Sequence, residues 1–239
     1  MSPRWERLVV RAMGSKQTVL TVLDREQVSG HFLRLLVDCG GLLAETDIHP
    51  TMWLRLWFED AGRPHQRAFT LVDPDPETGR AWLEFALHDG VAADWARAAQ
   101  PGQTIEASLL GSRYDWDADA PGTDEWASTL VAGDMASLPA VNSLLDRLGE
   151  TPVTVLLESV HDDDPAVPVR LKDRHELVRC LPGGRRVEDE LLRRAGRGDQ
   201  RVWVALEAAK TRGVVKRLRS EAGLAKKQVS ALGYWRADA

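Results

Sequence analysis

Four consecutive residues, Arg67-Ala68-Phe69-Thr70, place a cation, an aromatic ring and a hydroxyl within one short segment. A guanidinium can form paired hydrogen bonds with a phosphate, and a hydroxyl can hydrogen-bond to a heterocycle that lies against the ring. Together these groups suit a flat cofactor that carries phosphate. An ordinary strand is the alternative, because aromatic residues and threonine are common in strands. The elements around the segment decide between the two.

Two further segments suit an anionic ligand. Gly133 lies where an apolar run gives way to a helical pattern, so it allows a sharp turn and a close backbone approach. The free N–H groups of the next helix favour a phosphate there, although a plain strand–turn–helix connection explains the same residues. Gly90-Val91-Ala92-Ala93 also opens a helix after a strand-like run. Its N–H groups suit a pyrophosphate, and an unadorned helix start is the alternative.

Glu207 ends a later apolar run and precedes a helical pattern. Its carboxylate would either hydrogen-bond a ligand or cap the helix. That helix would either meet an anionic ligand or face solvent, since its charged residues are basic: Lys210, Arg212, Lys216, Arg217 and Arg219.

Other reactive residues do not combine into a site. His161 precedes Asp162-Asp163-Asp164, but adjacent acidic residues in a loop are usually solvated, so we expect no metal. The sequence has no nucleophile-elbow glycine pattern, no GxxxxGK[ST] and no GxGxxG. Cys39 and Cys180 lie far apart without a CxxC, which indicates buried thiols.

Composition and charge describe a globular protein of 239 residues with 44% hydrophobic and 28% charged residues. The net charge of −5 argues against a nucleic-acid-binding surface, which relies on concentrated lysine and arginine. No apolar run approaches the roughly 20 residues that span a bilayer, and the N-terminus lacks a signal-peptide core. We therefore expect a cytoplasmic protein without stable membrane insertion.

The first half of the chain alternates between apolar and polar residues, as in Leu54, Leu56 and Phe58, which share one strand face. This pattern predicts a six-stranded antiparallel β-barrel. Strands are expected at 18–22, 31–37, 53–58, 67–72, 82–87 and 104–109, with one Ala-rich helix at 90–99.

The second half follows a polar bridge at Asp115–Glu125, so we expect two domains, 1–122 and 123–239. Apolar strands alternate here with helices, which predicts a parallel sheet with helices on its faces. The strands are expected at 126–132, 152–160, 176–181, 201–206 and 227–234, and the helices at 136–148, 187–195 and 207–222.

In combination, these segments resemble the siderophore-interacting proteins, flavin-dependent ferric-siderophore reductases of the ferredoxin-reductase superfamily. The resemblance covers nearly the whole chain. It rests on Arg67-Ala68-Phe69-Thr70, His88 with the Gly90 segment, Gly111-Ser112-Arg113, Gly133-Asp134-Met135-Ala136-Ser137-Leu138-Pro139-Ala140, Glu207-Ala208 and Gly233-Tyr234-Trp235-Arg236.

The resemblance implies an N-terminal FAD-binding barrel and a C-terminal domain that binds NADH or NADPH. Hydride would pass to the flavin, and electrons would then reduce Fe(III) in a bound siderophore. By position, Arg67 would meet the flavin's phosphates or ring edge, Phe69 would lie against the ring, and Thr70 would hydrogen-bond near its reactive nitrogen as the catalytic residue. His88, Gly90, Ala92 and Ala93 would belong to the pyrophosphate segment. The nucleotide would be faced by Gly133, Asp134, Ser137, Leu138, Pro139 and Glu207, with Trp235 and Arg236 near the flavin or the substrate entrance.

The sequence departs from the family pattern at a few positions. Phe69 replaces a tyrosine, and Val72 replaces a second arginine. Ala93 replaces a residue with a hydroxyl, and Leu206, which replaces a glycine, is expected to crowd the nicotinamide. Lys210 and Arg212 are candidates for binding a 2′-phosphate. The resemblance thus favours a monomeric ferric-siderophore reductase. The alternatives are a flavin-deficient binding protein of the same fold and a flavin reductase with another acceptor.

Overall fold

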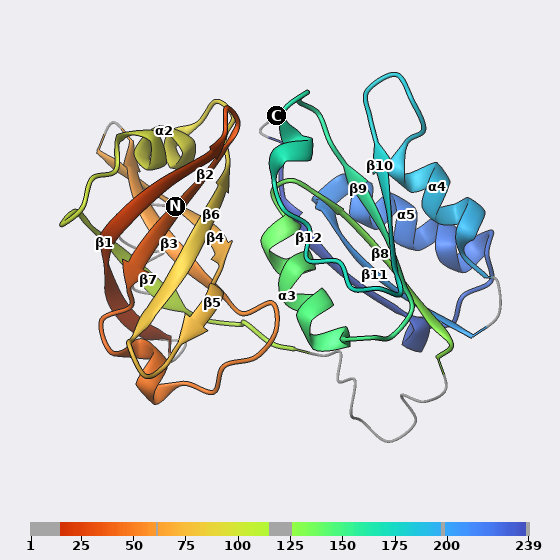
Figure 1. Ribbon diagram of the computed structural model, residues 1–239, viewed down its shortest axis with the longest axis horizontal. Helices are drawn as coiled ribbons and strands as arrows, with labels where there is room; N and C mark the ends of the chain where they lie inside the picture. The colour runs from red at the N-terminus through yellow and green to blue at the C-terminus, as the bar shows by residue number, and fades with distance from the viewer. Residues whose placement is uncertain (1–14, 61, 115–125, 197–198, 238–239) are drawn as a thin grey trace. The chain divides into compact units, whose positions relative to one another are not determined.

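The computed structural model describes residues 15–60, 62–114, 126–196 and 199–237 (Figure 1). The chain divides into two compact units, Met1–Tyr114 and Asp115–Ala239. The expected boundary between residues 122 and 123 lies outside the described residues. In the described part of the chain, no helix combines the length and the apolar character needed to cross a membrane.

The first unit is a curled antiparallel sheet of seven strands in the order β4-β3-β7-β1-β2-β6-β5. A 3₁₀ helix, η1 (Leu42–Glu45), and a helix, α2 (Val91–Ala98), accompany the sheet. The strands are β1 (Lys16–Ser29), β2 (Phe32–Asp38), β3 (Trp53–Asp60), β4 (Arg63–Thr70), β5 (Val72–Asp75), β6 (Arg80–Ala86) and β7 (Thr104–Leu109).

The strand count of six was wrong, because residues 67–72 do not form one strand. Strand β4 ends at Thr70, and β5 begins at Val72 and pairs with β6 in an irregular register. Asp73 has a φ of 48°, in the left-handed region that few non-glycine residues adopt. The backbone therefore bends where the residue pattern alone suggested a continuous strand followed by a turn.

The alternating pattern correctly located the core of this unit. Leu54, Leu56 and Phe58 of β3 are all buried, as predicted. They belong to one cluster with Leu83 and Phe85 of β6 and with buried alanines of α2. Burying a side chain of this size contributes about 1.5–3 kcal/mol, so the shared face is a sufficient reason for the sheet to curl around it.

The second unit is the parallel α/β sheet that the sequence predicts. Its five strands have the order β10-β9-β8-β11-β12, and the neighbouring strands are all parallel. They are β8 (Ser128–Asp134), β9 (Val153–Glu158), β10 (His175–Cys180), β11 (Gln200–Glu207) and β12 (Val229–Trp235). The connecting helices are α3 (Leu138–Leu148), α4 (Val187–Arg194) and α5 (Ala208–Ser220), with short 3₁₀ turns η3 (Asp164–Ala166) and η4 (Lys226–Gln228).

Helices cover both faces of this sheet (Figure 1). On one face, Val187 and Leu191 of α4 and Val214 and Leu218 of α5 pack in one core cluster with alternate residues of β8 and β11. Helix α3 packs on the other face, where Gly133 of β8 approaches it closely. The sheet is thus buried on both sides, as a parallel sheet requires.

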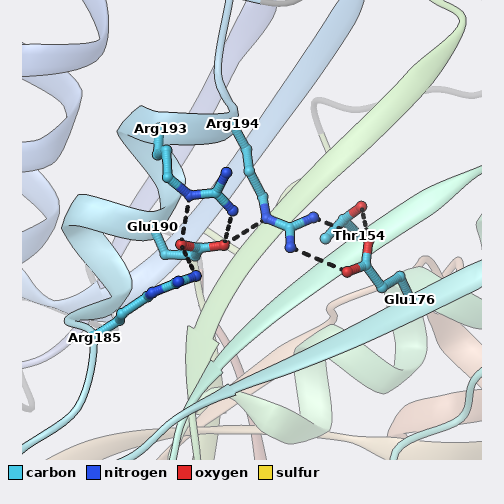
Figure 2. Close-up of polar contacts among 6 residues, drawn as sticks. All are labelled: Thr154, Glu176, Arg185, Glu190, Arg193 and Arg194. Carbon is cyan, nitrogen blue, oxygen red and sulfur yellow. Dashed lines mark hydrogen bonds and ion pairs between the residues drawn. The ribbon is translucent and has the colours of Figure 1, made fainter.

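An ion-pair network joins α4 to the sheet (Figure 2). Glu190, whose side chain is 1% exposed, accepts hydrogen bonds from Arg193 (Nε–Oε2 2.9 Å) and Arg194 (Nε–Oε1 2.7 Å). Arg194 also donates two hydrogen bonds to Glu176 of β10, at 2.9 and 3.0 Å. Arg193 and Arg194 lower the pKa of Glu190 to about 2. The network therefore fixes the last turn of α4 against the edge of the sheet.

Candidate functional site

The segment Arg67-Ala68-Phe69-Thr70 forms the end of β4. Arg67 and Ala68 are exposed, Phe69 is half-buried, and Thr70 is 3% exposed. Arg67 donates a hydrogen bond from Nη1 to the carbonyl oxygen of Gln66 at 3.0 Å. The cation is thus accessible at the surface, and the hydroxyl lies deeper in the unit.

Aromatic packing brings Phe69 and helix α2 together. The Phe69 ring lies 4.5 Å from Phe85 and 6.0 Å from Phe58, measured between centroids. Trp95 of α2 completes the cluster, 5.7 Å from Phe58 and 6.2 Å from Phe85. The Arg67–Thr70 segment and helix α2 therefore pack on the same aromatic cluster.

Helix α2 begins at Val91, with Gly90 as its N-cap residue at a φ of 141°. No side chain caps the start of the helix, so its first N–H groups can donate to other acceptors. Ala92 is half-buried, and Ala93 is 3% exposed. His88 is exposed, with Nδ1 2.6 Å from the carbonyl oxygen of Asp89. The small side chains and the uncapped helix start leave space and donors for a phosphate.

These features fit an FAD molecule on the first unit. An exposed arginine, a half-buried ring and an uncapped helix start supply the three chemistries that the cofactor needs. Val72 is 3% exposed, so its side chain contributes to packing. An arginine at this position would bury a charge unless the neighbouring strands moved.

In the second unit, the carboxyl ends of the strands form the other candidate site, as expected for an open parallel sheet. A Cβ atom at Gly133 would lie 2.7 Å from Ser137 Oγ and 2.9 Å from Val141 Cγ2. Glycine is therefore needed here for α3 to pack on β8. Ser137 is fully buried and hydrogen-bonds with Asp134 in both directions: the Ser137 N–H donates to Asp134 Oδ1 and the Asp134 N–H to Ser137 Oγ, both at 2.9 Å.

Trp235 reaches across the sheet edge to Asp134. Its Nε1 donates to Asp134 Oδ2 at 2.7 Å, although β11 lies between β8 and β12. Burial raises the pKa of Asp134, and the hydrogen bonds from Trp235 and Ser137 act in the opposite direction. The structure thus places two of the expected residues in direct contact.

Glu207 caps helix α5, as one of its two interpretations predicts. Its Oε2 accepts hydrogen bonds from the N–H groups of Ala209 (2.5 Å) and Lys210 (3.0 Å). The N–H donors, that of Lys210 first, lower the pKa of Glu207.

Burial limits what three other residues can contribute to a site. Leu138 and Pro139 are buried in the first turn of α3, so neither side chain is open to a ligand. Leu206 is fully buried in the core cluster with Val214 and Leu218. The expectation that Leu206 crowds the nicotinamide was wrong, because the side chain points into the core.

Arg236 is exposed beside an open pocket between α5 and β12 with a volume of about 780 Å³. Arg212, Lys216 and Arg219 line the same pocket, so the basic face of α5 borders a hollow.

One contact at the strand ends was not predicted from the sequence. Lys210 Nζ lies 2.6 Å from Oε1 and 2.8 Å from Oε2 of Glu158, the last residue of β9. The basic pattern of α5 flagged the lysine, but no local signal indicated its carboxylate partner. At the acidic loop, Asp164 is 1% exposed and its Oδ2 accepts from the N–H groups of Val160 and His161 at 2.7 and 3.0 Å. Among described residues, no group of three metal-binding side chains gathers.

Comparison with known families gives two matches that divide the chain in the same way. The model described as "Siderophore-interacting FAD-binding domain" matches residues 26–111, and the one described as "Siderophore-interacting protein" matches residues 126–238. Both candidate sites lie within the matched residues.

A curated relative is the mycobactin import ATP-binding/permease protein IrtA of Mycolicibacterium thermoresistibile, which is 33% identical over 98% of this chain. The alignment spans 26% of that protein, so the chain corresponds to about a quarter of its relative.

Solved structures establish the fold. A siderophore-interacting protein from Acinetobacter baumannii superposes with a TM-score of 0.79 at 19% identity, covering 92% of this chain and 91% of the other. A ferredoxin NADP+ reductase from Neisseria gonorrhoeae, solved with FAD and NADP, gives a TM-score of 0.68 at 12% identity and covers 92% and 99%. The fold is therefore ferredoxin-reductase-like.

Proposed function

Because the chain belongs to the siderophore-interacting protein family, we propose that it is an FAD-dependent oxidoreductase that uses NADH or NADPH to reduce a ferric siderophore. The observation that carries the proposal is the end of β4. There the Arg67–Thr70 segment packs through Phe69 on the same aromatic cluster as the uncapped helix α2, inside the region that matches an FAD-binding domain. The parallel sheet of the second unit supports a dinucleotide at its strand ends.

The bound flavin would supply hydride acceptance from NAD(P)H and single-electron transfer to iron, so one NAD(P)H would reduce two Fe(III) ions to Fe(II) and release one proton. The chain's own residues would hold and orient the reactants. Arg67 would bind phosphate or the ring edge, Phe69 would support the ring, and Thr70 would donate a hydrogen bond near the reactive nitrogen. His88, Gly90, Ala92 and Ala93 would form the pyrophosphate segment.

In the second unit, the turn from Gly133 through Ser137 to Pro139 would lie beside the dinucleotide at the strand ends. Asp134 and Trp235 would act as one hydrogen-bonded pair, because their side chains are already joined. Glu207 would keep α5 in place as its cap, and Arg236 would lie toward the substrate.

The substrate is proposed to be a ferric siderophore with hard oxygen ligands, which bind Fe(II) less tightly than Fe(III). Iron would then leave as Fe(II) in the cytoplasm, and the protein would act as a monomer. Mycobactin-type siderophores are the first to test, since the curated relative is named for mycobactin import.

Anaerobic reconstitution with FAD tests the proposal. We expect NAD(P)H to bleach the flavin absorbance and a ferric siderophore to restore it, with Fe(II) captured by a chromogenic chelator. Thr70→Val should lower the rate of flavin reduction while the FAD Kd stays within a few-fold. Failure of the protein to bind either FAD or FMN would refute the proposal that it is a flavin-dependent enzyme.

A flavin-deficient binding protein is the second candidate, and the buried Val72 and the missing phenol of Phe69 favour it. This candidate predicts a stable two-unit protein without flavin. Substitutions at Val72 and Leu206 are poor tests because both side chains are buried. Phe69→Tyr is a better one, since the half-buried ring leaves access for a phenol.

A further inference from the structure

An ion pair spans the carboxyl end of β8 in the second unit. Lys210 lies in the first turn of α5, which follows β11, and Glu158 ends β9. Since β8 lies between β9 and β11 in the sheet, the contact between Lys210 Nζ and Glu158 at 2.6 and 2.8 Å reaches across the end of β8. The side chains remain 37% and 27% exposed, so a ligand from solvent can reach them.

The strand ends beside this pair are rich in carboxylates. Asp134 is the register partner of Glu158 on the neighbouring strand, and Glu207 ends β11. Asp134 is held by Trp235 and Ser137, and Glu207 by two N–H groups of α5. Among the described residues, the contact recorded for the Glu158 carboxylate is Lys210 alone. Glu158 is therefore the carboxylate that can move without breaking a cap or a turn.

We propose that Lys210 binds a phosphate group of the dinucleotide and that Glu158 forms an ion pair with Lys210 until the phosphate displaces it. The inference rests on the proposed function, because it needs a dinucleotide at these strand ends. A phosphate can take the place of the carboxylate with little loss for the ammonium group, which has three donors on a flexible four-carbon stem. Removing the Glu158 charge would also lessen repulsion of the phosphate.

A purely structural role gives a different expectation. If the pair only tied β9 to α5, replacing either partner would lower stability and leave dinucleotide affinity unchanged. Competition with a ligand instead predicts changes of opposite sign in the Kd. Glu158→Gln should bind more tightly by about two- to fivefold, the range of one partly exposed charge interaction. Lys210→Gln should bind about tenfold more weakly, because a charge-assisted hydrogen bond to phosphate is lost.

The test is isothermal titration calorimetry of the whole 239-residue chain, supplemented with FAD, with NAD+ and with NADP+ as ligands. Lys226→Gln is the control, since it removes the same charge from an exposed position in η4, which precedes β12 and does not line the pocket, and its Kd should stay within about twofold. Lys210→Arg keeps the charge and should bind within about threefold of wild type, which separates loss of the cation from a folding defect. Thermal melts check that each variant is folded.

Comparing the affinities for NAD+ and NADP+ shows which phosphate group Lys210 binds. An equal loss of affinity for NAD+ and NADP+ in Lys210→Gln would assign Lys210 to the pyrophosphate, and a loss for NADP+ alone would assign it to the 2′-phosphate. Either result supports the proposal. Equal effects of Lys210→Gln and Lys226→Gln on the Kd, or shifts of the Kd in the same direction in the Glu158 and Lys210 variants, would overturn it while the proposed function stands. A wild-type protein that binds neither dinucleotide would overturn both.

Discussion

Replacing Glu190 by glutamine should destabilise the second unit much more than replacing Glu176, although both carboxylates contact Arg194 (Figure 2). The Glu190 side chain is 1% exposed, and the Glu176 side chain is 55% exposed. Glutamine keeps the shape of the side chain and removes the charge. Glu190→Gln therefore weakens charge-assisted hydrogen bonds in a buried position, whereas Glu176→Gln changes a solvated pair.

The magnitude follows from the pKa of Glu190, which the arginines lower from 4.5 to about 2. A full shift of this size corresponds to roughly 3 kcal/mol. Solvent reaches the arginine partners, so we expect a loss of about 2 kcal/mol in the free energy of unfolding. For a protein of this size, that lowers Tm by about 4–8 °C. Glu176→Gln should cost no more than about 1 kcal/mol.

The pH dependence of the free energy of unfolding provides an independent test. Because the folded-state pKa of Glu190 is depressed, its contribution is present above the unfolded value of 4.5 and is lost as the pH falls toward about 2. Between pH 5 and pH 3, wild type should lose about 1–2 kcal/mol more than Glu190→Gln.

Thermal melts of both variants across this pH range are the assay. Parallel pH profiles for wild type and Glu190→Gln, or equal losses in the two variants at neutral pH, would refute the reasoning from burial.

Three further predictions concern the sites. Gly133→Ala should lower the free energy of unfolding by about 1–3 kcal/mol, because its Cβ would overlap Ser137 and Val141; Gly213→Ala, in the open middle of α5, should instead raise it by about 0.5–1 kcal/mol in the same urea titration. Trp235→Phe should raise the pKa of Asp134 further in a carboxyl NMR titration, because the lost hydrogen bond opposes the effect of burial. Since a raised carboxyl pKa adds stability at low pH that is lost as the pH rises, the destabilisation in this variant should grow from pH 4 to pH 7, and a constant difference would contradict it. Arg67→Gln should weaken FAD binding by about tenfold, and Phe69→Tyr should strengthen it by up to about tenfold, both measured by flavin fluorescence quenching; unchanged affinities would remove the cofactor from β4.

Local patterns predicted most of the fold because each pattern reports burial on one face. Leu54, Leu56 and Phe58 alternate at strand spacing, and all three lie in the core. Alternating strands and helices in the second half similarly predicted the parallel sheet. The missed strand, β5, depends on the positive φ of Asp73, which residue types alone do not reveal.

The contacts of the second-unit site were harder to predict. Trp235 and Asp134 are 101 positions apart in the chain, and Lys210 and Glu158 are 52 apart. Each pair meets only because the order of the parallel strands brings their carboxyl ends to one edge. The motifs identified Trp235 and Asp134 individually, but only the tertiary structure shows that they are partners. Leu206 illustrates the reverse case, since its place in a motif suggested crowding and its face of β11 puts it in the core.

The most direct test of the central claim is an anaerobic visible spectrum of the FAD-reconstituted protein through one catalytic cycle. The account predicts flavin absorbance that NAD(P)H bleaches and a ferric siderophore restores, with two Fe(II) ions trapped for each NAD(P)H consumed. A protein that stays colourless after reconstitution with FAD or FMN would contradict it, as would a reduced flavin that ferric siderophores leave unoxidised.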